Sequence, residues 1–198
     1  DFQIVSTTPA TPVGSNATPT LGAPGPENST APIQRNSTIK STLVDPGCVG
    51  TSTDPTTACA RIRTGSGNSG TLLIRRRFTN NTGASVTKLR FRIVDITTVA
   101  GASEPATTAD LRVQSTTASV VNCTGAGGGC AGMPATATIT PMTLESPPSG
   151  AGNGGLNSSV LVTLGGPLAN GNAVNVSFTL LIQQAGGYRF FVNVEALP

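Results

Sequence analysis

The sequence has no histidine and no tryptophan, and Tyr188 is its single tyrosine. Without histidine, neither a Ser-His-Asp triad nor the usual catalytic zinc site can form. Lys40 and Lys88 lie in no recognisable Ser/Lys motif. The nine acidic residues leave a paired-carboxylate hydrolase open, but none of them lies in an aromatic-lined segment. We therefore expect a protein without catalytic residues, metal or cofactor.

Charge is also scarce, because charged residues make up only 11% of the chain and the net charge is +3. So weak and dispersed a charge does not predict nucleic-acid binding, which needs a dense basic face. No run of about eighteen apolar residues occurs, so no membrane span is expected. The chain starts at Asp1 without a visible signal peptide, which suggests a processed mature chain or a fragment of a larger one. Abundant Thr and Val with little Lys or Glu favour strands over helices.

The four cysteines fall into two local pairs, Cys48 with Cys59 and Cys123 with Cys130. Four cysteines allow three connectivities, and the sequence alone does not choose among them. Each local pair brackets a Gly/Thr/Pro-rich loop that can bend back on itself, which favours local disulfides. A zinc site is the competing interpretation, but histidine is absent and neither pair has the short spacing of structural zinc modules. Disulfides would indicate an oxidising compartment and therefore export.

Residues 1–35 are rich in Thr, Pro, Ser, Asn and Gly, and closely spaced prolines favour an extended conformation. The first six residues differ from the rest of this segment. They carry Phe2, Ile4 and Val5, and alternation places Phe2 and Ile4 on one face of a short strand. Residues 1–6 are therefore a candidate donor strand on a long extended tether.

From residue 36 to residue 198 the pattern changes to short strands separated by Gly, Pro and Asn turns. This alternation predicts an all-β fold, an antiparallel β-sandwich of the Ig-like or jelly-roll kind. We expect about eight strands, at Ser37–Val44, Thr71–Thr79, Val86–Ile96, Leu111–Val121, Ala135–Leu144, Ser159–Leu164, Ala173–Ile182 and Tyr188–Ala196.

Two pairs of these strands are predicted to be hairpins. Thr71–Thr79 and Val86–Ile96 flank the turn sequence Asn-Asn-Thr-Gly, the strongest local hairpin signal in the chain. The last two strands are predicted to join through the loop at 184–187.

Basic residues alternate along the first of these hairpins. On neighbouring strands they would form a stripe on one sheet face, which would be a candidate surface for an acidic glycan, a cell-wall polymer or nucleic acid. The alternative, which we favour, is a solvated face neutralised by Asp95, Glu104, Asp110 or Glu145. Arg76 differs in phase and is expected at a core margin, paired with a carboxylate. The residues of the stripe are Arg75, Arg77, Lys88, Arg90 and Arg92.

The block RRRFTNNTGASVTKLRFRIVDITT (residues 75–98), with LGAPGPENSTAPIQRN upstream and PLANGNAVNVSFTLLIQQAGGYRFFVNVEALP at the end, carries a resemblance. From residue 21 onward the chain resembles a β-rich module near the C-termini of large bacterial secreted and cell-surface proteins. The resemblance implies export and a surface role. It assigns no chemistry and no functional residues.

These observations give two functional hypotheses from different classes. The first is a non-enzymatic structural protein, secreted or on the cell surface, that forms a homopolymeric filament by inserting its N-terminal strand into the next subunit. The second is a glycan- or cell-wall-binding sandwich that belongs to a larger secreted adhesin-like protein. The absence of Trp and the single Tyr count against the second, because sugar-binding platforms use exposed aromatic residues.

Overall fold

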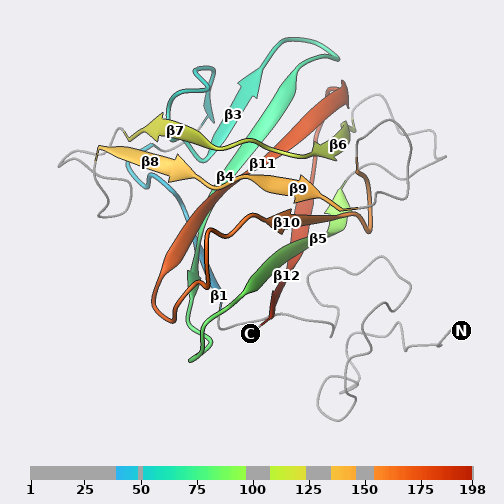
Figure 1. Cartoon of the computed structure of the whole chain (residues 1–198). Helices are drawn as coiled ribbons and strands as arrows, with labels where there is room; N and C mark the ends of the chain where they lie inside the picture. Colours follow the sequence, from blue (N-terminus) through green and yellow to red (C-terminus); the bar gives the residue numbers. More distant parts are fainter. Residues whose placement is uncertain (1–38, 49–50, 97–107, 124–134, 146–153, 198) are drawn as a thin grey trace, which may run out of the picture.

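The computed structural model describes residues 39–48, 51–96, 108–123, 135–145 and 154–197. Two antiparallel sheets pack face to face, and a two-stranded hairpin lies beside them (Figure 1). The sandwich predicted from the sequence is therefore confirmed. The described strands are β1 (Ile39–Thr42), β2 (Thr51–Ser52), β3 (Arg61–Thr64), β4 (Thr71–Asn80), β5 (Lys88–Ile96), β6 (Asp110–Gln114), β7 (Ser119–Asn122), β8 (Thr136–Ile139), β9 (Met142–Leu144), β10 (Ser159–Val162), β11 (Ala173–Gln184) and β12 (Phe190–Leu197).

The first sheet, called sheet I, has the order β2-β3-β4-β11-β6. Strand β4 is its centre, because it pairs with β11 from Thr71 to Thr79 along one side. Along its other side it pairs first with β3 and then with β1, so these two short strands follow one another on the same edge. Among the strands that the structure describes, only β2 and β3 pair in parallel.

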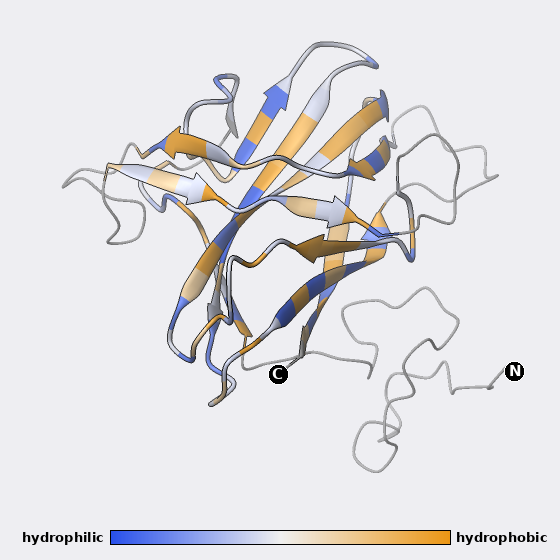
Figure 2. Ribbon diagram, in the orientation of Figure 1, coloured by the Kyte–Doolittle hydropathy of each residue, from blue (hydrophilic) through white to orange (hydrophobic). Residues whose placement is uncertain are grey.

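The second sheet, called sheet II, has the order β12-β5-β10-β9. Its central strand β5 alternates between apolar and charged residues, and Figure 2 shows this as alternating colours along the ribbon. Leu89, Phe91 and Ile93 point into the sandwich and are at most 1% exposed, whereas the basic residues between them point outward. Strand β5 thus has the one buried face that period-two alternation predicts.

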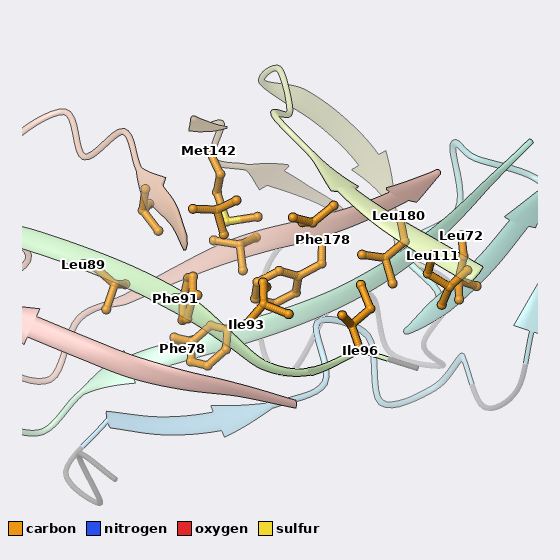
Figure 3. Packing of buried hydrophobic residues seen from close by; sticks show 14 of the residues in the cluster. Leu72, Phe78, Leu89, Phe91, Ile93, Ile96, Leu111, Met142, Phe178 and Leu180 are labelled. Atoms are coloured by element: carbon orange, nitrogen blue, oxygen red, sulfur yellow. The ribbon is translucent and has the colours of Figure 1, made fainter. Parts of the chain in front are cut away.

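Aromatic rings fill the middle of the sandwich. Phe91 lies 4.5 Å from Phe78 and 5.1 Å from Phe178, measured between ring centroids. These are the tilted and edge-to-face arrangements that aromatic pairs prefer. Figure 3 shows the three rings side by side, with Leu72, Leu111 and Leu180 at one end of the same core. The rings come from β4, β5 and β11, so they join the two sheets.

A second, smaller core covers part of the outer face of sheet I. Val44 and Ala58, from the segment between β1 and β3, pack with Val121, Ala137 and Ile139 of the β7–β8 hairpin. Backbone hydrogen bonds join the two parts, since Ala58 N donates to Asn122 O over 2.7 Å. The outward side of β4 and β11 is therefore not fully exposed to solvent.

Both predicted hairpins are wrong. Strand β4 lies in sheet I and β5 in sheet II, and β11 and β12 are divided between the sheets in the same way. The side chain of Asn80, which is fully buried, directs the first crossing. Its amide nitrogen donates to Ala84 O and Leu168 O over 2.8 and 2.7 Å, which ties the connection to the loop before β11.

The structure also divides two predicted strands. Leu111–Val121 becomes β6 and β7, and Ala135–Leu144 becomes β8 and β9. The strands β2 and β3 were not predicted. No helix occurs among the residues that the structure describes, and none there could cross a membrane.

Candidate assembly seam and adjoining cleft

One side of the sandwich has an incompletely buried inner edge. Strand β12 is the terminal strand of sheet II, and its inward-facing residues Phe190, Val192, Val194 and Ala196 are only partly buried, as is Ile74 on β4. The inward residues of β5, β10 and β11, in contrast, are almost fully buried. We call these five partly buried residues the β12 seam.

The opposite side of the sandwich is closed by hydrogen bonds between the sheets. Thr116, just after β6, donates its N–H to Met142 O over 2.8 Å. Its hydroxyl accepts from Met142 N over 2.9 Å, and Leu144 N donates to Ser115 Oγ over 2.8 Å. An additional strand therefore fits the apolar surface at β12 better than at β9.

Three arginines lie at the margin of the inner face of sheet I, on its β3 side, and Arg61 is exposed. Arg61 and Arg63 on β3 lie opposite Ile74 and Leu72 on β4, so their side chains share the inner face with those apolar residues. Arg76 lies in phase with Phe78 on that face of β4. Its Nε donates to Ser41 Oγ over 2.9 Å, and partial burial lowers the pKa of Arg76. The position of Arg76 at the core margin agrees with the prediction, but its partner is Ser41, not the predicted carboxylate.

A cleft of about 290 Å³ opens beside β3 at the end of the sandwich near Tyr188. Its apolar lining is Leu72, Ala109, Leu111 and Ile182, all of which belong to or adjoin the main core. Its polar lining comes from Ser52, Thr53, Arg61, Arg63, Gln184 and Tyr188.

Local turn geometry positions one of the cleft arginines. Arg63 Nη2 donates to Gly67 O over 2.6 Å and to Ser69 O over 3.4 Å, both in the turn between β3 and β4. Gly70 closes this turn with φ +94°, and a Cβ there would lie 2.0 Å from Thr64 O. A side chain at position 70 would therefore break the turn that holds Arg63.

The outer face of sheet II carries a network of ion pairs. Glu195 accepts from Arg90 and Arg92, and Glu145 contacts Arg90 and Lys88. Burial lowers the pKa of Arg90, but the hydrogen bond that Arg90 donates to Glu195 and the negative charges of Glu195 and Glu145 raise it overall. Three of the five residues of the predicted stripe, Lys88, Arg90 and Arg92, thus have acidic partners on their own sheet. Glu145 is one of the predicted partners, whereas the main partner, Glu195, was not predicted.

The other two residues of the predicted stripe lie elsewhere. Arg75 and Arg77 are on β4, in the other sheet, so the five basic residues do not form one stripe. Arg75 is only 3% exposed and is not a surface residue. Its guanidinium donates to Thr57 O and, over 2.7 Å, to Pro55 O. Burial lowers the pKa of Arg75, which the nearby Asp54 partly counters.

The segment that covers Arg75 is closed by a disulfide. Cys48 is bonded to Cys59, with their Cα atoms 5.0 Å apart, as predicted. Cys123 is also disulfide-bonded, while Cys130 lies outside the described residues. The bridge closes the loop that contains Pro55 and Thr57, whose carbonyls accept hydrogen bonds from the Arg75 guanidinium. It therefore helps to hold the groups that stabilise the buried charge of Arg75.

The remaining predicted charges have local partners. Asp95 pairs with Arg189 over 3.2 Å and Asp110 with Arg112 over 3.0 Å. Glu104 lies outside the described part of the chain, as do Phe2, Ile4 and Val5 of the candidate donor strand. The sequence analysis did not identify Arg61 and Arg63 as cleft residues. The alternation Arg-Ile-Arg at residues 61–63 is the sequence pattern that indicates them, but the strand has only four residues, so the pattern is weak.

Among the described residues, no three His, Cys, Asp or Glu side chains lie close enough to hold a metal ion. No protein-family model, curated protein or solved structure matches this chain. The likeness to a bacterial cell-surface module stays a prediction.

Proposed function

We propose that this chain is a non-enzymatic structural protein of the bacterial cell exterior, which assembles into filaments when the N-terminal strand of one subunit adds to β12 of the next. The observation that carries the proposal is the β12 seam. It combines the terminal strand of a sheet with an apolar inner row that the described part of the chain leaves partly uncovered.

The donor segment matches this seam in pattern. Residues 1–6 place Phe2 and Ile4 on one face, about 7 Å apart in an extended strand. The same spacing separates consecutive inward side chains of β12. An added strand gains main-chain hydrogen bonds from the sheet edge, and burial of each apolar side chain contributes about 1.5–3 kcal/mol.

The tether is long enough for the strand to reach a second molecule. Residues 7–38 separate the donor strand from β1, and an extended Pro-rich chain spans about 3 Å per residue. Because donor and acceptor are different surfaces, each added subunit presents a new acceptor. Such a head-to-tail contact extends into a filament unless its rotation closes a ring.

Export is part of the same proposal. A structural disulfide at Cys48 and Cys59 is typical of proteins that fold in an oxidising compartment.

Deletion tests the proposal. Removing residues 1–6 should leave a folded monomer, whereas removing Gly14–Pro19 from the tether takes away the same number of residues and should leave filaments. Negative-stain microscopy and sedimentation give the assembly state, and circular dichroism reports the fold. Normal filaments from the first variant would show the proposal to be wrong.

The second candidate, a glycan- or cell-wall-binding module, is favoured by one observation, the cleft with its two arginines and Tyr188. Filament formation and ligand binding do not exclude each other, because the cleft residues are distinct from those of the β12 seam.

A further inference from the structure

The cleft beside β3 carries two cations that no carboxylate neutralises within the described part of the chain. Arg61 Nη1 donates to the Tyr188 hydroxyl over 3.3 Å, and Arg63 donates to two backbone carbonyls. Both partners are neutral.

Four arginines elsewhere in the described part of the chain differ. Arg90 and Arg92 share Glu195, although they lie on a solvent-facing sheet surface. Arg112 and Arg189 likewise each contact an aspartate. Two guanidinium groups without an acidic partner, at the mouth of one cleft, favour an anion from outside. A carboxylate fits best, because a planar guanidinium can bind both of its oxygens.

The other residues that line the cleft indicate the chemical character of the part of the ligand beyond its carboxylate. The floor is apolar, formed by the buried residues Leu72, Leu111 and Ile182, while the more exposed polar residues Ser52 and Thr53 also line the cleft. Figure 3 shows Leu72 and Leu111 adjacent at this end of the core. Tyr188 adds a partly buried ring whose hydroxyl already contacts Arg61.

A pyranose ring has the matching character, with an apolar C–H face and hydroxyl groups around its edge. The volume, about 290 Å³, is at the lower end of the range for small-molecule sites and suits one ring. We propose that this cleft binds a carboxylated sugar, with the carboxylate on Arg61 and Arg63 and the apolar face of the ring toward Leu72 and Leu111.

The experiment measures binding of glucuronate and galacturonate to the full chain by titration calorimetry and by amide chemical shifts. Glucose serves as the neutral control and acetate as the bare carboxylate. The expected result is binding of a uronate, weaker at high salt, with shifts at residues of the cleft. If glucose bound as tightly as the uronates, the proposed role of the arginines would be wrong. If acetate bound as tightly as the uronates, the proposed role of the sugar ring would be wrong. Absence of any uronate binding would overturn the whole proposal.

Variants then locate the site. Arg61→Gln removes one cation without touching the β3–β4 turn, and it should weaken uronate binding about tenfold or more. Tyr188→Phe removes only the hydroxyl and should weaken binding less. Arg189→Gln is the matched control, because that side chain lies outside the cleft lining and pairs with Asp95. Unchanged binding by the Arg61 variant would exclude this cleft as the site.

This result is independent of filament formation. A chain without residues 1–6 keeps Arg61, Arg63 and Tyr188, so the uronate should bind to it as well. Failure of the sugar proposal would therefore leave the assembly proposal standing, and the reverse also holds.

Discussion

Arg92 and Glu195 form a two-point ion pair across β5 and β12. Arg92 Nε and Nη2 lie 3.0 and 2.9 Å from Glu195 Oε1, and the glutamate side chain is 7% exposed. Its other oxygen accepts from Arg90 Nε over 2.5 Å. One buried carboxylate thus holds two arginines, and it joins the terminal strand of sheet II to its neighbour on the outer side.

Glu195→Ala should therefore destabilise the fold more than an ordinary surface substitution does. It removes several charge-assisted hydrogen bonds and leaves two partly buried arginines without this partner, at a cost of about 2–3 kcal/mol. Glu145→Ala is the control, since that carboxylate is more exposed and its pairs with Lys88 and Arg90 are long, 3.9 and 3.4 Å. Its expected cost is below about 1 kcal/mol. Urea unfolding measures both, and equal costs would contradict the assignment.

Loss of the Cys48–Cys59 bridge should also lower stability. The bridge joins two cysteines that are 11 positions apart in the sequence, and restriction of the unfolded chain over this length predicts about 3 kcal/mol. The same change loosens the Pro55 and Thr57 carbonyls that hold Arg75. The double variant Cys48→Ala/Cys59→Ala is compared with Val120→Ala, at a position that is 64% exposed. A loss no larger than in the control would mean that the bridge does not support this part of the fold.

Acid should weaken the same loop through Asp54. Hydrogen bonds from the Thr56 hydroxyl and N–H, both to Oδ1, lower the pKa of Asp54 below its usual 3.8. The folded state thus holds the proton less tightly than the unfolded state. The stability from Asp54 is fully present above pH 3.8 and is lost as the pH falls through the lower folded value. Carboxyl titration by NMR measures this pKa, and a value at or above 3.8 would refute the prediction.

A variant without the donor strand and a variant with a blocked acceptor should combine into a heterodimer and form no longer assembly. A chain without residues 1–6 keeps its acceptor, whereas Val194→Glu places a charge in the β12 seam and keeps its donor. Neither should polymerise alone, but a mixture of the two should form a 1:1 heterodimer and stop there. Phe191→Glu is the control for the acceptor, because Phe191 points outward and is 42% exposed. Mass photometry measures the species, and long polymers from the mixture would exclude head-to-tail addition at this seam.

Alternation along the sequence predicted which side chains enter the core, but it did not predict strand partners. Phe91 and Phe178 are buried in the predicted phase, because period-two alternation fixes one apolar face. The apolar face of a strand can be buried equally well whether the next strand in the sequence pairs with it in the same sheet or lies in the opposite sheet. The hydrogen bond from the Asn80 side chain to Leu168 O, 88 residues away, favours the crossing from sheet I to sheet II. No local sequence pattern predicts this contact.

The candidate sites were only partly predictable for the same reason. The outward phase of Arg75 was evident from the sequence, but its burial was not, because the covering residues come from the disulfide loop and the β7–β8 hairpin. Arg61 and Tyr188 lie 127 residues apart in the sequence and meet only in the folded sandwich. The β12 seam likewise exists only once β12 is the last strand of its sheet.

Photo-crosslinking from the donor strand tests the central claim most directly. Benzoylphenylalanine replaces Phe2 in an equal mixture of ¹⁵N-labelled and unlabelled chains, and mass spectrometry identifies the crosslinked peptides after irradiation of the filaments. Our account predicts that half of the crosslinks join a labelled to an unlabelled chain, and that they end on β12 or on β4 near Ile74. Crosslinks within single chains only, or crosslinks that end away from the β12 seam, would contradict it.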